Sequence, residues 1–399
     1  MKRGLQILIG LITLAALVAA GWFALRPFAL DAMRSDTSAT LEGLRRDANT
    51  DKFTRAYQPR DFKFPEDHGP HNDFQTEWWY YTGNMTDTTG RHFGYQLTFF
   101  RRALVPPDEQ AQVNGRPSDL AFTQLYFAHF AVTDTSANQH VSFEKYSRAA
   151  AGLAGAHAQP FKVFIEDWSA TATGSTGSAE AVQLKAQRDG YGIDLDLTMS
   201  KPMVFHGDHG LSKKSLEAGN ASYYYSMTRM ATHGKVTTPQ GTFDVSGESW
   251  LDREWSTSAL DDKTAGWDWF SLQLSDQHEI MFYQLRLKDS TSAVVSSGTY
   301  VDAESKTQQL LRDDVKIDVL DHWISDSGAN YPMKWRVRIP KYGLDLQLAP
   351  RIKDQEMKLS QRYWEGAATV DGTANGKPIS GVGYVELTGY TGDSLTTPR

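Results

Sequence analysis

The residues between positions 247 and 255, with the sequence GESWLDREW, are the strongest candidates for chemistry in this chain. The segment is typical of a β-strand, in which successive side chains point to opposite faces. Trp250, Asp252 and Glu254 would then lie on one face, opposite Arg253. Two carboxylates on one face repel, so one should bind a proton more tightly unless a cation lies between them. The pattern suits an acid–base pair, and it suits equally an ion-pair network at a domain junction.

A second acidic residue with aromatic neighbours lies in the segment 71–83, HNDFQTEWWYYTG. In a strand, Glu77, Trp79 and Tyr81 would share one face. A carboxyl group beside aromatic walls is desolvated, which raises its pKa and would let Glu77 act as an acid. Alternatively, the aromatic residues fill a barrel interior and Glu77 pairs with an arginine of residues 101–102.

A third acidic residue, Asp268, is flanked by two tryptophans, and it would face solvent if they face a core. These segments give two groups of candidate site residues. The candidate catalytic residues are Asp252, Glu254, Glu77 and Asp268. The candidate ligand-binding residues are Trp78, Trp79, Tyr81, Tyr224, Trp250, Trp255, Trp267, Trp269 and Arg253.

The composition excludes several classes of function. There is no cysteine among the 399 residues, so thiol catalysis, disulfides and cysteine-ligated metals are excluded. The net charge of −7 argues against a nucleic-acid partner. The motifs of elbow-serine hydrolases, zinc peptidases, P-loop proteins and dinucleotide-binding proteins are missing from the sequence. The segment 206–210, HGDHG, lacks a third metal partner. We therefore expect neither a metal nor another cofactor.

An internal repeat organises the chain after about residue 60. Short alternating strands predict an all-β fold, and their landmarks recur in the same order. At an offset of 188, Trp79 falls on Trp267, and at an offset of 134, Asp252 falls on Glu386. The repeat predicts two tandem antiparallel β-barrels, residues 61–256 and 257–399. Two β-domains that share only strand patterns, or sandwiches in place of barrels, are the alternatives.

The N-terminus predicts export. Lys2 and Arg3 precede an uncharged, mostly apolar stretch from residue 4 to residue 25. We expect residues 1–25 to be a membrane anchor or a signal peptide and residues 26–60 to be a spacer. The rest of the chain would then lie on the periplasmic side of the cell envelope, either anchored to the inner membrane or secreted, and would meet the membrane only through this segment.

Several segments together resemble the AttH/carotenoid 1,2-hydratase group of lipocalin-like proteins, many of which are described as predicted secreted hydrolases. The similar region runs from about Pro65 to Tyr390. The resemblance implies two lipocalin-like barrels after the N-terminal helix, and an ABC-transporter permease as a partner. The segments are HNDFQTEWWYYTGN, FGYQLTFFRRAL, KPMVFHGDHGLSKK, NASYYYSMTRM, GESWLDREWSTSAL, GWDWFSLQL and YWEGAATV with GVGYVEL.

The resemblance also implies a reaction. A hydratase adds water to a C=C bond, for which a buried carboxylic acid donates a proton and aromatic faces stabilise the carbocation. The matching acids are Asp252, Glu254, Glu77 and Asp268. Many relatives have histidine where this chain has Arg253, and arginine cannot shuttle protons at neutral pH. A structural or ligand-anchoring role for Arg253 is therefore implied.

Two functions follow from these observations. The first is an exported protein that binds a hydrophobic ligand, such as a lipid or an isoprenoid, in a hollow and apolar barrel. The second is a hydratase that acts on a polyene or a terpenoid, with no serine or thiol hydrolase chemistry.

Overall fold

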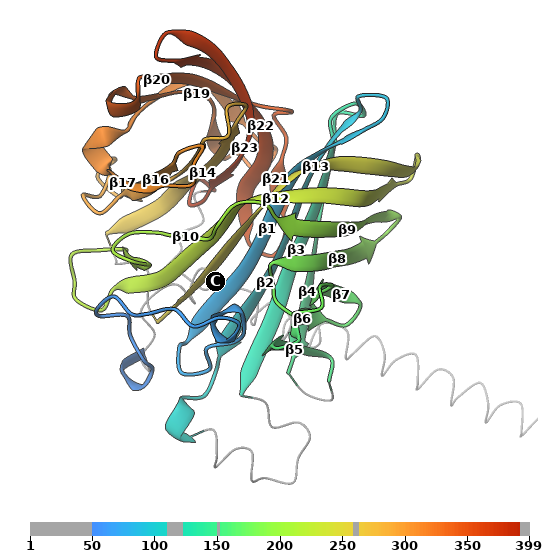
Figure 1. Ribbon diagram of the computed structural model, residues 1–399, viewed down its shortest axis with the longest axis vertical. Helices are drawn as coiled ribbons and strands as arrows, with labels where there is room; N and C mark the ends of the chain where they lie inside the picture. The colour runs from blue at the N-terminus through green and yellow to red at the C-terminus, as the bar shows by residue number, and fades with distance from the viewer. Residues whose placement is uncertain (1–49, 110–122, 150–151, 258–262, 392–399) are drawn as a thin grey trace, which may run out of the picture.

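The computed structural model describes residues 50–109, 123–149, 152–257 and 263–391, and it is almost entirely β-structure. The all-β prediction is confirmed, with two barrel-like sheets (Figure 1). The predicted N-terminal segment 1–25 and most of the predicted spacer lie outside the described residues. Within the described ranges, no helix has the length and apolar character needed to cross a membrane. The short 3₁₀ helices are η1 (Thr50–Lys52), η2 (Glu66–His68), η3 (Arg312–Asp314) and η4 (Pro340–Tyr342).

The first sheet has thirteen strands in the order β4-β3-β2-β1-β13-β12-β9-β8-β7-β6-β5, and β10 and β11 also pair with β12. Neighbouring strands of this sheet pair in antiparallel fashion throughout the described residues, which suits hairpin connections. Its strands are β1 (Thr76–Asp87), β2 (His92–Ala103), β3 (Gln124–Asp134), β4 (Gln139–Arg148), β5 (Ala154–Ala158), β6 (Phe161–Ile165), β7 (Trp168–Ala172), β8 (Ala181–Arg188), β9 (Tyr191–Met199), β10 (Val204–Phe205), β11 (Leu211–Lys213), β12 (Ala221–Thr238) and β13 (Gly241–Ser256).

The second sheet has ten strands and repeats this order on a smaller scale. Its order is β17-β16-β15-β14-β23-β22-β20-β19-β18, with β21 paired to β22. In both sheets the first long strand pairs with the last one, β1 with β13 and β14 with β23. The strands are β14 (Thr264–Leu274), β15 (Glu279–Leu287), β16 (Ser297–Val301), β17 (Thr307–Leu311), β18 (Lys316–Ile324), β19 (Asn330–Ile339), β20 (Leu344–Pro350), β21 (Glu356–Lys358), β22 (Arg362–Ala374) and β23 (Lys377–Leu387).

Each sheet encloses an apolar core made of its own side chains. In the first core Trp79, Trp168 and Trp255 are completely buried, and in the second Trp335 and Trp364 are almost completely buried. These indoles alternate along their strands with residues that point outward. Both interiors are therefore packed with protein side chains, in contrast to the hollow interior that the aromatic pattern predicted.

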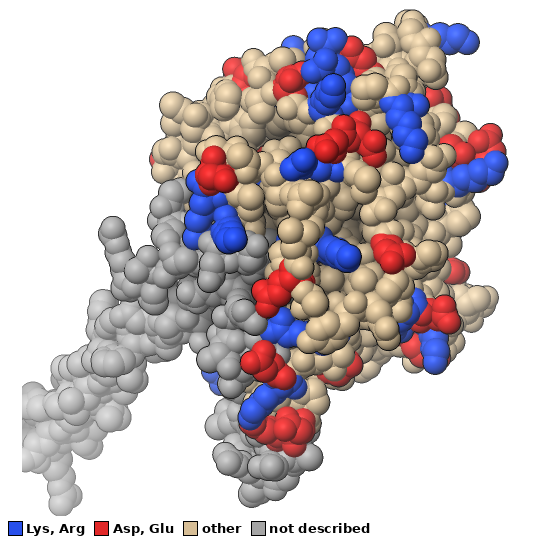
Figure 2. Space-filling view, turned by 90° about the vertical axis from the view of Figure 1, so that its left-hand side faces the viewer, with Lys and Arg blue, Asp and Glu red and all other residues tan. Residues whose placement is uncertain are grey.

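A third apolar cluster lies between the two sheets. It joins the outward-facing residues of β1, β12 and β13 to those of β14, β15, β22 and β23. Gly94 of β2 allows this close approach, since a Cβ atom at Gly94 would lie 2.8 Å from the Cβ atom of Ala367 in β22. On the face shown in Figure 2, basic and acidic side chains are interspersed and form no extended patch of one sign.

A buried ion-pair cluster also joins the sheets. Glu279 of β15 is completely buried and pairs with Lys201 at 2.8 Å and with Arg229 of β12 at 2.7 Å. The Lys201 ammonium also donates to the carbonyl oxygens of Gln277 and Asp302. Arg229 comes from the first sheet, Lys201 from the connection between β9 and β10, and their carboxylate from the second sheet, so the cluster holds the two sheets in one relative position.

We expect Glu279→Gln to destabilise the protein strongly. The substitution leaves Lys201 without its carboxylate partner and Arg229 with Glu248 alone, at 3.6 Å, and breaking a buried pair costs about 3–5 kcal/mol. Asp313→Asn is the control, because Asp313 is highly exposed and such pairs contribute at most about 1 kcal/mol. Denaturant unfolding of both variants tests this expectation. Equal free energies of unfolding would contradict it.

Candidate active site

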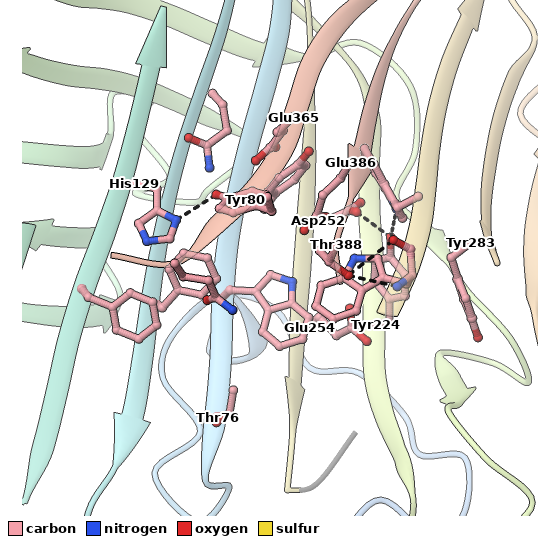
Figure 3. Close-up of a pocket in the computed structure, with 18 of the residues that line it drawn as sticks. Thr76, Tyr80, His129, Tyr224, Asp252, Glu254, Tyr283, Glu365, Glu386 and Thr388 are labelled. Carbon is pink, nitrogen blue, oxygen red and sulfur yellow. Dashed lines mark hydrogen bonds between the residues drawn. The ribbon is translucent and has the colours of Figure 1, made fainter. Parts of the chain in front are cut away.

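A cavity of about 140 Å³ lies between the outer faces of the two sheets (Figure 3). That volume accommodates a group of about the size of one aromatic ring. Three rings on its wall, Trp78, Phe100 and Trp267, are partly exposed and give the cavity a route to solvent. We call this cavity the inter-sheet chamber. Its lining residues are Thr76, Trp78, Tyr80, Gln96, Phe100, Arg101, Arg102, Phe127, His129, Lys214, Tyr224, Asp252, Glu254, Trp267, Trp269, Tyr283, Leu285, Gln361, Tyr363, Glu365, Glu386 and Thr388.

Asp252 has the most complete hydrogen-bond shell of the acids that line the chamber. Tyr224 donates to Oδ2, Ser226 donates to Oδ1, and Trp250 donates its indole N–H to Oδ1 at 2.6 Å. Burial raises the pKa of Asp252 to about 7, although the three donors each favour the ionised form. Asp252 can therefore gain or lose a proton near neutral pH.

Glu254, two residues along β13, has a cation as its partner. Lys214 lies 2.7 Å from its Oε1 atom, and the Ser222 hydroxyl donates to the same oxygen. The Lys214 ammonium also lies 4.4 Å from the centre of the Tyr283 ring. The two carboxylates of this strand therefore have different surroundings, because among the described residues a cation pairs with Glu254 and none pairs with Asp252.

Two further acids come from the second sheet. Glu365 of β22 and Glu386 of β23 are direct cross-strand partners, and like charges in this position repel. Burial, assisted by the charges of Asp252 and Glu254, raises the pKa of Glu386 to about 8. Burial and the charge of Glu386 raise the pKa of Glu365 well above its ordinary value. The Tyr80 and Tyr363 hydroxyls act on Glu365 in the opposite direction and favour its ionised form, but burial outweighs them.

The end of the chamber near His129 has polar atoms that are free to bind a ligand. His129 Nδ1 lies 2.8 Å from the Tyr363 hydroxyl, whereas its Nε2 atom has no partner among the residues described. The Gln96 carbonyl oxygen is likewise buried and unpartnered within those ranges. Burial lowers the pKa of His129 to about 3, so its ring is neutral. The chamber thus combines aromatic walls with a few polar atoms, as ligand sites commonly do.

The structure brings about half of the predicted site residues together. Trp250 belongs to the apolar cluster between the sheets, where its indole N–H donates a hydrogen bond to Asp252. The predicted residues that line the chamber are Asp252, Glu254, Trp78, Tyr224, Trp267 and Trp269. Those that point into the first barrel are Glu77, Trp79, Tyr81, Trp255 and Arg253.

The prediction that Glu77 acts as a protonated acid is wrong. Glu77 is completely buried inside the first barrel between Arg101 and Arg253, which both pair with it. Burial alone would raise its pKa, but these two guanidinium groups hold the pKa of Glu77 well below its ordinary value. Arg253 also stacks over Trp79, with its Cζ atom 4.0 Å from the ring centre. The alternative, in which Glu77 pairs with an arginine, is the one that the structure shows.

Asp268 also lies away from the chamber. It is buried on the other face of β14, where Arg286 donates to it at 2.9 Å and the Tyr390 hydroxyl at 3.0 Å. The expected exposure to solvent is therefore wrong, because Tyr390 and Arg286 cover this side of the strand.

Sequence analysis missed most of the chamber residues, including six titratable ones, although two signals pointed to some of these six. The repeat placed Glu386 on Asp252, and the structure places both acids at the chamber. The alternation of β1 placed Tyr80 on the face opposite Glu77, which is the chamber face. The six titratable residues that were missed are Tyr80, His129, Lys214, Tyr363, Glu365 and Glu386.

The chamber has the parts needed for acid–base chemistry on an apolar molecule. Glu386 is mostly protonated at pH 7, whereas Asp252 is divided between its two forms. Such a pair can donate a proton to one atom of a ligand and accept a proton from another. Among the described residues no cluster of three or more His, Asp or Glu side chains is arranged for a metal ion.

Comparison with known proteins identifies relatives over most of the chain. The AttH-like family profile matches residues 55–390. A kievitone hydratase from Fusarium solani subsp. phaseoli is 26% identical over 183 residues, which are 44% of this chain and 51% of that protein. The chain thus spans about half the length of this relative.

Solved structures show the same architecture. A Nitrosomonas europaea protein described as an AttH is 32% identical, with a TM-score of 0.73 over 85% of this chain and 100% of its own. A kievitone hydratase from Nectria haematococca has a TM-score of 0.63 at 16% identity, over 84% of this chain and 95% of its own. This second likeness concerns the fold alone.

The raised pKa values predict a pH-dependent stability. Between about pH 4 and about pH 8, the folded chain binds protons at Glu386 and Asp252 that the unfolded chain has already released. The stability that these bound protons contribute is therefore lost as the pH rises through this window. We expect the free energy of unfolding of wild type, relative to Glu386→Gln, to fall by about 2–4 kcal/mol over this window. Denaturant unfolding at several pH values measures the difference. A difference that is constant with pH would contradict the assignment.

Proposed function

The chain belongs to the AttH-like family, and we propose that it is a hydro-lyase that adds water across a C=C bond of an apolar small molecule. One observation supports this proposal above the others. Two carboxyl groups from different sheets, Asp252 and Glu386, face one aromatic chamber with pKa values raised to about 7 and about 8. The name of one relative, kievitone hydratase, supports water addition as the class of reaction.

Glu386 is the proposed acid. Its pKa of about 8 keeps the carboxyl group protonated at neutral pH, next to the aromatic walls. Transfer of this proton to one carbon of the double bond forms the new C–H bond and leaves a carbocation on the other carbon. The faces of Trp78, Trp269 and Tyr224 stabilise that cation by about 2 kcal/mol or more where water is excluded.

Asp252 is the proposed base. Its three hydrogen-bond donors favour the ionised form, so that it can accept a proton from a water molecule that attacks the carbocation. Oxygen of that water forms the new C–O bond, and its proton moves to Asp252. Arg253 takes no part in this step, because it lies in the first barrel against Glu77.

The size of the chamber limits what reacts there. Since about 140 Å³ holds a group of the size of one ring, the chamber would enclose the reacting end of a larger molecule. The unpartnered atoms of His129 and Gln96 would bind a hydroxyl or a similar polar group on that molecule.

We expect Glu386→Gln and Asp252→Asn each to lower the rate of hydration by at least about 100-fold, because each removes one proton-transfer group. The assay incubates the protein with organic extract of its host in ¹⁸O-labelled water, and mass spectrometry detects compounds that gain one labelled water. Asp268→Asn is the matched control, since Asp268 is buried in the second barrel and should leave the rate unchanged. Full conversion by both chamber variants would refute the assignment.

Storage or transport of an apolar ligand is the second candidate function, and the aromatic lining favours it. Affinity would then come mainly from apolar contact area, at about 25 cal/mol per Å². We also propose that the chain is exported through its N-terminal segment and that it works with an ABC-transporter permease, as exported members of such families often do.

We expect Trp267→Ala to weaken binding of the apolar fluorophore N-phenyl-1-naphthylamine by roughly tenfold or more, because Trp267 lines the chamber. Trp323→Ala is the control, because Trp323 is partly exposed on β18 and does not line the chamber. Fluorescence titration measures both dissociation constants. Equal affinity in the two variants would show that the probe binds elsewhere.

A further inference from the structure

A continuous chain of hydrogen bonds leads away from Asp252 on the side opposite the chamber. Ser226 donates its hydroxyl hydrogen to Asp252 Oδ1, and Ser226 Oγ lies 2.6 Å from His206 Nε2. His206 Nδ1 in turn lies 2.8 Å from the Thr299 hydroxyl. All four side chains are at least 95% buried, so water does not interrupt the chain.

The end of this hydrogen-bond chain at Thr299 lies at a second cavity. This cavity is lined by Thr299 and Gly207, the residue after His206, and by exposed groups such as Asp208 and His209. Ser226 and His206 belong to the first sheet and its connecting loop, whereas Thr299 belongs to β16 of the second sheet. The hydrogen-bond chain therefore crosses the interface between the sheets and joins the two cavities.

The hydrogen-bond chain can be formed with either of two opposite donor–acceptor arrangements, and the protonation of Asp252 decides between them. When Asp252 is ionised, Thr299 donates to His206 Nδ1, His206 Nε2–H donates to Ser226, and Ser226 donates to Asp252. When Asp252 is protonated, every donor and acceptor can exchange roles. Burial lowers the pKa of His206 to about 3, which keeps the imidazole neutral, with one N–H donor and one acceptor.

We propose that Ser226, His206 and Thr299 form a proton relay that exchanges the proton of Asp252 with water in the second cavity. The proposal rests on the proposed function, because it supplies the step that restores Asp252 after the addition of water. Asp252 gives its proton to Ser226, Ser226 gives its own to His206 Nε2, and His206 gives its Nδ1 proton to Thr299. Thr299 gives its hydroxyl proton to water, so that one proton leaves Asp252 and one reaches the solvent. Every intermediate residue ends neutral.

The charged groups around the relay do not compete with it. Lys214 is the cation whose charge acts on His206, and it forms an ion pair with Glu254. The aromatic neighbour of His206 is Tyr224, with ring centres 4.3 Å apart, and the Tyr224 hydroxyl donates to Asp252 Oδ2. The relay uses the other oxygen, Oδ1.

The test measures proton exchange at Asp252 in the intact protein without any substrate. Aspartate labelled with ¹³C in the side-chain carboxyl gives an isotope-edited infrared band for the protonated group, which the loss of the band in Asp252→Asn assigns. Stopped-flow mixing with D₂O, slightly below the pKa of about 7, then gives the rate of H/D exchange. We expect Thr299→Val to slow this exchange by at least about tenfold, because it removes the hydroxyl but preserves the side-chain volume.

Two further variants separate a relay from a packing effect. Thr299→Ser retains the hydroxyl and should restore the wild-type rate. His206→Gln retains hydrogen-bonding groups but cannot pass a proton between two nitrogens, so it should be as slow as Thr299→Val. Wild-type exchange in Thr299→Val, or equal slowing in Thr299→Val and Thr299→Ser, would overturn the relay. The exchange measurement does not depend on turnover, so a normal exchange rate in Thr299→Val counts against the relay alone, whereas absence of hydration by the wild-type protein counts against the proposed function alone.

Discussion

The burial of two sheet faces against each other determines the chemistry of this protein. An antiparallel sheet can leave one face in water, and in a barrel that is the outer face. Here the outer face around β1 and β13 packs on the outer face around β14 and β23, and aromatic rings fill much of the space. Any carboxyl group on either face is thereby taken out of water. Its behaviour then depends on whether a cation accompanies it.

The structure contains buried carboxyl groups with a cationic partner and buried carboxyl groups without one among the described residues. Glu279, at the interface between the sheets, lies between two basic side chains and stabilises the structure, as Glu77 does inside the first barrel. Glu365 and Glu386 lie opposite each other across β22 and β23 with no such partner among the described residues, and burial raises the pKa of each. Asp252 is intermediate, because hydroxyl and indole donors stabilise its ionised form without supplying a charge. This difference between neighbouring acids allows one to act as an acid and another as a base.

The pattern of the sequence was sufficient for the fold class and for the face on which each strand residue lies. Glu77, Trp79 and Tyr81 do share one face, and Asp252 and Glu254 share another. Strand alternation cannot say which face points into a barrel, since both faces of β1 are aromatic. Nor can it show that two barrels bury their outer faces together. The acids of β1 and β14 were therefore placed at the site, whereas those of β22 and β23 were missed.

The repeat explains why one site needs both halves of the chain. Asp252 and Glu386 occupy corresponding positions on the last strand of each sheet, but their cross-strand partners differ: Ser226 lies opposite Asp252 and Glu365 opposite Glu386. The hydroxyl of Ser226 leaves Asp252 able to ionise, while burial and the charges of Asp252 and Glu254 keep Glu386 protonated. Two copies of one strand pair, facing each other, therefore supply unlike groups to the same chamber. A single barrel would expose its acid to water and lose the shift that makes that acid useful.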